Sequence, residues 1–120
     1  MQINLEAADH NSIQAYGDHE IKINSEVYQS SLIVSRHEII DWPITSIQHL
    51  NEESLELLLK YDPKVILIGH NQTGQLAPLS IIQTLTNRRI GIETMSIGAA
   101  CRTFNLLLNE HREVVIGIII

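Results

Sequence analysis

The sequence has few of the residues that usually bind nucleic acid or carry redox chemistry. It contains one cysteine, Cys101, so an internal disulfide is excluded and a reducing cytoplasm is the expected location. Aromatic residues make up 4% of the chain, which leaves little for base stacking. Lysine and arginine number 8 against 14 acidic residues, and the resulting net charge of −6 repels phosphate backbones. These shortages argue against a nucleic-acid partner.

The sequence pattern also predicts neither a signal peptide nor a membrane-spanning segment. The opening MQINLEAADHNS has neither a basic nor an apolar region of the signal-peptide kind, and no apolar run is long enough to cross a bilayer. The six histidines, at positions 10, 19, 37, 49, 70 and 111, match no helical metal motif such as H-E-x-x-H. We interpret them as surface residues and expect neither a metal ion nor a cofactor, while a metal site built from distant segments stays open.

The first third of the chain has the pattern of β-strands. The segments 12–16 and 20–24 alternate between apolar and polar residues and are separated by a Gly-Asp turn signal, which predicts a hairpin. The segment 27–35 is rich in β-branched residues and predicts a third strand. Trp42 precedes a proline that holds it in an extended conformation, and we expect it to anchor packing against the sheet.

The second half of the chain alternates between helical and strand patterns. Helices are predicted over 51–61, 78–88 and 98–112, the first with Asn51 as its N-cap. Apolar strands are predicted over 64–69, 89–95 and 113–120. Right-handed crossovers make such strands parallel. We therefore predict an α/β fold: one three-layer domain over residues 1–120, with a mixed, mostly parallel central sheet and an N-terminal β hairpin.

Two loops follow strands at the edge where open parallel sheets bind ligands. The loops 69–78 and 95–98 each lead to a helix N-terminus, where free N–H groups favour an anion such as a carboxylate or phosphate. The candidate ligand-binding residues are Gly69, Thr73, Gly74, Gly98, Ala99, Ala100, Cys101 and Arg102. Their spacing matches neither a dinucleotide-binding fingerprint nor a P-loop, so glycines that only turn the chain remain the alternative.

The stretch GAACRT, residues 98–103, is the strongest chemical candidate. Cys101 is expected in the first turn of a helix beside Arg102, and both features favour a thiolate. No second cysteine and no neighbouring histidine accompanies it, so we expect packing rather than catalysis and assign no catalytic residue. Arg102 opposes the helix dipole, which leaves either a salt bridge to Glu93 or Glu110, or a bound anion.

Several segments together resemble a known family. They are INSEVYQSSLIV (23–34), DWPI (41–44), VILIG (65–69) and, most specifically, RIGIETMSIGAACRTFNLLLNEHREVV (89–115). The chain resembles the small domain family of the mitochondrial complex I assembly factor 3 and the adipogenesis-associated Mth-domain protein. The resemblance implies a β-plus-α/β/α domain, support of complex assembly through protein contacts, and no defining enzyme activity.

The chain departs from that family's pattern at the candidate site. Residues 69–74 read GHNQTG where the family tends to have G-T-G, and Ser96-Ile97 replaces an Asp-Thr pair whose carboxylate would have been a candidate acid or base. The glycine usual near the end of the last helix is His111 in this sequence. These differences weaken an enzyme hypothesis for this chain.

Three functional hypotheses follow, in order of preference. The first is a non-enzymatic assembly or interaction factor with an unidentified protein partner. The second is a small-anion or nucleotide-binding protein that uses the loops at the carboxyl ends of the parallel strands. The third is a thiol enzyme or redox sensor at Cys101.

Overall fold

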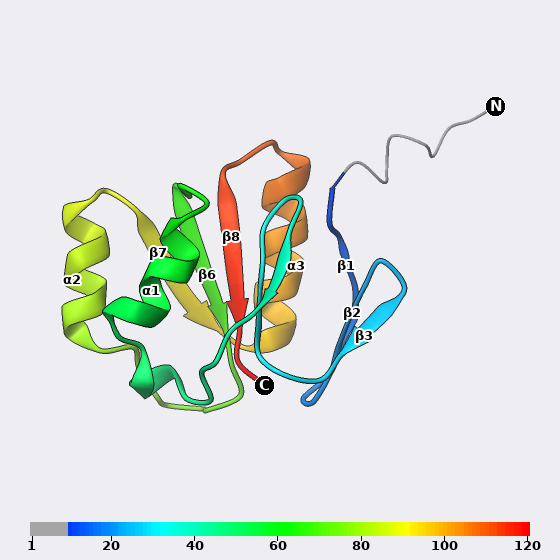
Figure 1. Ribbon diagram of the computed structural model, residues 1–120, viewed down its shortest axis with the longest axis horizontal. Coiled ribbons are helices and arrows are strands. Elements are labelled where there is room, and N and C mark those ends of the chain that lie inside the picture. Colours follow the sequence, from blue (N-terminus) through cyan, green and yellow to red (C-terminus); the bar gives the residue numbers. More distant parts are fainter. Residues whose placement is uncertain (1–9) are drawn as a thin grey trace.

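The computed structural model describes residues 10–120 and places two β-sheets around helix α3 (Figure 1). The smaller sheet contains β1 (Ile13–Tyr16), β2 (Ile21–Ile23) and β3 (Glu26–Tyr28), paired antiparallel in that order. The predicted N-terminal hairpin is therefore confirmed, with one further strand.

The predicted third strand over 27–35 is two strands in the structure. The first part is β3, which ends at Tyr28, and the second is β4 (Leu32–Val34), which belongs to the larger sheet. Ser31 lies at the crossing: its carbonyl accepts from the Trp42 N–H at 3.0 Å, and its hydroxyl accepts from the Ile120 N–H at 2.9 Å. These bonds to distant segments draw the chain from one sheet to the other.

The larger sheet has the strand order β5-β4-β8-β6-β7. Its remaining strands are β5 (Ile39–Asp41), β6 (Val65–Gly69), β7 (Gly91–Met95) and β8 (Val114–Ile118). β6 pairs parallel with β7 and β8, whereas β4 pairs antiparallel with β8 and β5. The sheet is therefore mixed, as predicted, but β5 was missing from the prediction because so short a strand is defined by its partner β4 rather than by its own pattern.

Helices cover both faces of the larger sheet and complete the three layers (Figure 1). α1 (Glu52–Leu59), α2 (Leu79–Asn87) and the short 3-10 helix η2 (Ile47–His49) pack on one face, and α3 (Ile97–Asn109) packs on the other. Asn51 caps α1 as predicted, because its side chain accepts from the Ser54 N–H at 2.8 Å while the Ser54 hydroxyl accepts from the Asn51 N–H. Within residues 10–120, no helix has the length and apolarity needed to cross a membrane.

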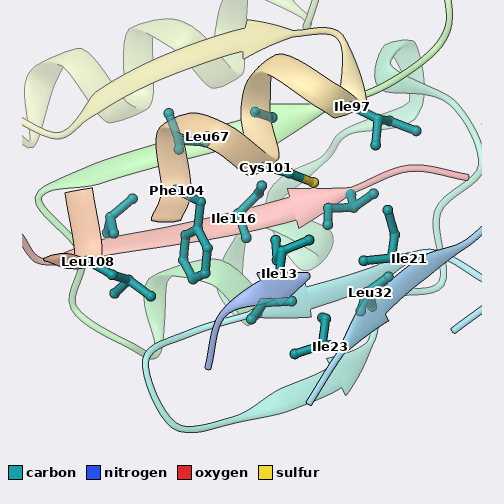
Figure 2. Packing of buried hydrophobic residues seen from close by; sticks show 14 residues of the cluster. Ile13, Ile21, Ile23, Leu32, Leu67, Ile97, Cys101, Phe104, Leu108 and Ile116 are labelled. Atoms are coloured by element: carbon teal, nitrogen blue, oxygen red, sulfur yellow. The ribbon is translucent and has the colours of Figure 1, made fainter. Parts of the chain in front are cut away.

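Trp42 packs between the larger sheet and α1. Its side chain is 2% exposed, its ring lies over Gly117 of β8, and its Nε1–H donates to the Ser54 carbonyl at 3.2 Å. This contact confirms the predicted packing anchor. The opposite face is filled by α3 and by residues of the smaller sheet, among them Ile13, Ile21 and Ile23 (Figure 2).

Candidate functional site

Cys101 lies in the core and is shielded from solvent. Helix α3 begins at Ile97, with Ser96 as N-cap, so Cys101 is its fifth residue and lies in the second turn instead of the predicted first turn. Its side chain is 0% exposed and packs in the cluster that includes Phe104 and Ile21 (Figure 2). Burial raises the pKa of the Cys101 thiol to about 12, against a smaller opposing effect of the Arg102 charge. The thiol is therefore protonated at neutral pH and serves packing.

Arg102 pairs with a tyrosine of the smaller sheet. Its guanidinium donates to the Tyr16 hydroxyl at 2.6 Å and lies 5.8 Å from the centre of the Tyr16 ring. Both predicted carboxylate partners were wrong, since among the described residues no ion pair joins Arg102 to Glu93 or Glu110. Gly98 allows this contact, because a Cβ there would stand 2.7 Å from the Tyr16 ring.

Asn105, also on α3, forms two side-chain hydrogen bonds with the backbone of the edge strand β1. Its side-chain oxygen accepts from the Ile13 N–H at 3.0 Å, and its amide donates to the Ile13 carbonyl at 2.9 Å. Gly98, Arg102 and Asn105 are spaced i, i+4 and i+7, so they lie on one face of the helix. That face holds the smaller sheet against α3.

The loop after β6 approaches α3 closely. A Cβ at Gly69 would stand 3.0 Å from the Cβ of Ala100 and 3.1 Å from the Cα of Ile97, so only glycine fits there without displacement. Gly74 has φ of +82°, the left-handed conformation that favours glycine, in a turn where the Gln75 N–H donates to the Gln72 carbonyl. Both glycines thus have structural roles.

A solvent-open hollow lies at the carboxyl ends of β6 and β7, where the sequence predicted a ligand site. It has a volume of about 370 Å³ and is lined by Asp18, His19, His70, Asn71, Thr73 and Ser96. Of the candidate residues only Thr73 lines it, and none of its lining residues among those described is lysine or arginine. Ala100 and Cys101 do not line it, and both have exposures of 0%.

His70 is the most enclosed polar side chain of this hollow. Its side chain is 9% exposed, so its interpretation as a surface histidine was wrong. The Gln72 N–H donates to its Nδ1 at 3.1 Å, which leaves the proton of the neutral ring on Nε2. Burial lowers the pKa of His70, so the ring is a neutral hydrogen-bond donor toward the hollow.

A second polar hollow lies at the other end of the sheet, between the end of α3 and the start of β8. Its volume is about 350 Å³, and its lining includes Arg36, Glu38, Tyr61 and Arg112. The Tyr61 hydroxyl donates to Glu38 at 2.8 Å, and burial together with that carboxylate raises the pKa of Tyr61 to about 12. Arg36 donates to the Leu108 carbonyl. Sequence reasoning missed this hollow because its residues come from three separated segments.

The described part of the chain holds no cluster of three or more His, Cys, Asp or Glu side chains placed to bind a metal ion. The arrangement instead offers a buried thiol, a neutral histidine and an arginine engaged with a tyrosine. Within residues 10–120, these groups serve packing and hydrogen bonds inside the chain.

The family model, the curated relatives and the solved structures that match this chain point to one family. A family model described as "Protein of unknown function (DUF498/DUF598)" matches residues 13–119. A Francisella tularensis protein named "13 kDa major membrane protein" is 34% identical over 94 residues, covering 77% of this chain and 76% of that protein. An NMR structure of a Xanthomonas campestris protein is 30% identical, with a TM-score of 0.84, covering 99% of this chain and 92% of that one.

The human "NADH dehydrogenase [ubiquinone] 1 alpha subcomplex assembly factor 3" is 26% identical over 109 residues. That match covers 89% of this chain but 59% of the human protein, so this chain corresponds to little more than half of that relative. The family expected from the sequence is confirmed. The chain belongs to the DUF498/DUF598 family, the domain family of complex I assembly factor 3.

Proposed function

We propose that this chain is a non-enzymatic domain that supports assembly of a respiratory complex through contact with a partner protein. The observation that carries the proposal is the internal use of the GAACRT stretch. Cys101 is enclosed in the core, and Arg102 binds Tyr16 of the same chain. The residues that looked most reactive in the sequence therefore connect α3 with the core and the smaller sheet. We infer that the function resides in the protein's exposed surface and not in a reaction centre.

The partner we propose is a subunit of NADH dehydrogenase, by analogy with the assembly factors named for that complex. The net charge of −6 favours a partner with a basic contact surface. We place this contact in the cytoplasm, the compartment expected from the cysteine content.

Affinity isolation of the tagged full chain from the cells that produce it tests this proposal. After brief chemical crosslinking, mass spectrometry should identify NADH dehydrogenase subunits at a higher level than with an unrelated tagged acidic protein of similar size. Recovery of the chain alone, or of equal amounts with both baits, would contradict the proposed partner.

A second candidate function is binding of a small anion or nucleotide at the carboxyl ends of the strands. The hollow beside Thr73 and the start of α3 supports it, since His70 offers a neutral Nε2–H donor there. Of the ligand-binding residues expected from the sequence, this proposal keeps Thr73, which lines the hollow together with His70. Asp18 and the missing cations among the described lining residues make this candidate the weaker one.

Thermal unfolding with inorganic phosphate and with ATP tests the second candidate. A ligand at one hundred times its Kd adds about 2.7 kcal/mol to the free energy of unfolding, which raises Tm by several degrees. An unchanged Tm at millimolar ligand, or an equal rise with sodium sulfate alone, would contradict specific binding.

A further inference from the structure

Strand β7 is a free edge of the larger sheet. It is last in the strand order, and none of its residues is buried, whereas every residue of β8 is. The Gly91 N–H donates to the Lys64 carbonyl, and the Met95 carbonyl accepts from the His70 N–H. Since backbone groups alternate sides along a strand, the N–H and C=O groups of Ile92 and Thr94 point away from β6.

No described residue satisfies these outward groups. Within residues 10–120, no side chain or loop forms a hydrogen bond with the backbone of Ile92 or Thr94. In contrast, the Asn105 side chain occupies the backbone of Ile13 at the edge strand β1. β7 therefore retains donors and acceptors in the arrangement that accepts another strand.

An apolar hollow runs beside this edge, on the face that α2 covers. Its volume is about 240 Å³, and its lining is Leu76, Ala77, Leu79, Ile82, Ile92 and Thr94. Leu76 and Leu79 are 73% and 67% exposed, the highest values among the large hydrophobic side chains described. A strand paired with β7 would direct every second side chain into this hollow.

The opposite face of the same edge carries an uncompensated charge. Glu93 is exposed, pairs in register with Leu67 on the α3 side, and forms no ion pair within the described chain. A second copy paired antiparallel about Glu93 would set two like charges directly opposite, which destabilises strand pairs. A basic residue opposite Glu93 would be attracted instead.

We propose that the free edge of β7 binds an extended segment of the partner protein, with apolar residues at alternate positions and a lysine or arginine between them. The apolar residues lie in the hollow beside Leu79 and Ile82, and the basic residue faces Glu93. This assignment rests on the proposed interaction function and specifies the surface that performs it.

The probes are two synthetic peptides, acetyl-Thr-Val-Lys-Val-Thr-amide and the same peptide with glutamate in place of lysine. Titration into the 15N-labelled full chain should shift the amide signals of Ile92 and Thr94 and slow their hydrogen exchange. Because facing charges act across the strand pair, the lysine peptide should bind about three- to tenfold more tightly. Glu93→Lys should reverse that preference.

Thr94→Pro is the blocking variant, because it removes only an outward-facing N–H, the position where an edge strand tolerates proline. Thr94→Val is its matched control, since it keeps the N–H and a β-branched side chain. Thr94→Pro should abolish binding of both peptides with an otherwise native spectrum, and Thr94→Val should bind as the wild type does.

Three outcomes would overturn the proposal: no binding at millimolar peptide, equal binding by Thr94→Pro, or protection of the two amides that grows with protein concentration alone, which would identify a second copy as the occupant. The same variants in the affinity isolation separate this proposal from the proposed function. If Thr94→Pro still captures NADH dehydrogenase subunits, the surface is wrong and the function stands. If the wild type captures none, the function fails by itself.

Discussion

At Gly117, the backbone of β8 passes directly under the ring of Trp42. A Cβ at this position would stand 2.5 Å from the ring, and Trp42 is 2% exposed with its indole N–H bound to Ser54. Since the ring has no open space to move into, the close approach requires glycine. The requirement is invisible in the sequence, where Gly117 interrupts an otherwise apolar strand.

Gly117→Ala should therefore lower the free energy of unfolding by about 1–3 kcal/mol, the usual cost of overpacking a core. Urea unfolding followed by Trp42 fluorescence measures it. Gly91→Ala is the matched control in an exposed strand, where the nearest atom to the new Cβ is 3.8 Å away. It should leave stability unchanged or raise it by about 0.4–1 kcal/mol. Equal midpoints for the two variants would contradict the packing described at Trp42.

Cys101 should resist alkylation in the folded protein. Its thiol is 0% exposed and its pKa is raised to about 12 by burial, so neither access nor thiolate is available at pH 8. Iodoacetamide labelling followed by mass spectrometry should show modification only in urea. Rapid labelling of the native chain would revive the thiol-enzyme hypothesis.

The same burial makes stability depend on alkaline pH. The pKa of Cys101 rises on folding from 9.0 to about 12, so its contribution is complete below pH 9 and is lost as pH rises toward 12. The slope is about 1.4 kcal/mol per pH unit inside that window. Urea unfolding of wild type and Cys101→Ala across this range isolates the effect, since other groups titrate in both. A constant difference between the two proteins would contradict it.

Among the elements, α3 connects the two sheets. Its inner residues fill the core, while Gly98, Arg102 and Asn105 hold β1 through Tyr16 and Ile13. The outermost pair, Asn105 and Ile13, is separated by 92 positions along the chain. These three residues of α3 therefore serve the docking of the smaller sheet.

Asn105→Ala should lower the free energy of unfolding by about 1–3 kcal/mol, because both backbone groups of Ile13 lose their partner. Hydrogen exchange should accelerate more at Ile13 than at the amides of β6. Asn109→Ala is the same change at the exposed end of α3, where the asparagine side chain forms no hydrogen bond within residues 10–120. Its free energy of unfolding should stay within about 0.5 kcal/mol of the wild-type value. Equal exchange at Ile13 in both variants would show that Asn105 does not hold β1.

The sequence predicts an element when local residues define it, and fails when contacts with distant segments define it. α1 and β6 were predictable because a local cap and a continuous apolar run define them. β5 was not, because its pairing with β4 defines it, and the division between β3 and β4 was not, because bonds of this segment to β8 and to Ile120 define it. At the candidate site, the loops at the strand ends were predictable, but the Tyr16 partner of Arg102, 86 positions away, was not.

At the scale of the whole molecule, the smaller sheet and the larger sheet share one core. Ile21 and Ile23 of β2 are 0% exposed and pack in the same cluster as Leu67 of β6 and Phe104 of α3. The smaller sheet buries its apolar face in this shared cluster, and without that packing its short strands lack a core. We therefore expect the two sheets to unfold together.

Ile23→Ala should lower the free energy of unfolding by about 2–5 kcal/mol, as for other buried isoleucines. The loss should be equal when followed by Trp42, which lies in the other core cluster, and by far-ultraviolet circular dichroism. Val27→Ala in the same small sheet removes a side chain that is 52% exposed and should have little effect. Two separate transitions for Ile23→Ala would show that the smaller sheet unfolds independently.

We propose that this domain acts by contact with a protein and without chemistry at Cys101. The most direct test of this proposal is the amount of assembled NADH dehydrogenase, resolved on native gels, in cells lacking the chain and complemented with wild type or Cys101→Ala. We predict less assembled complex in the deletion and full recovery with both proteins at equal folded levels. Normal assembly in the deletion would contradict the proposed assembly function, and recovery by the wild type alone would show that Cys101 takes part in it.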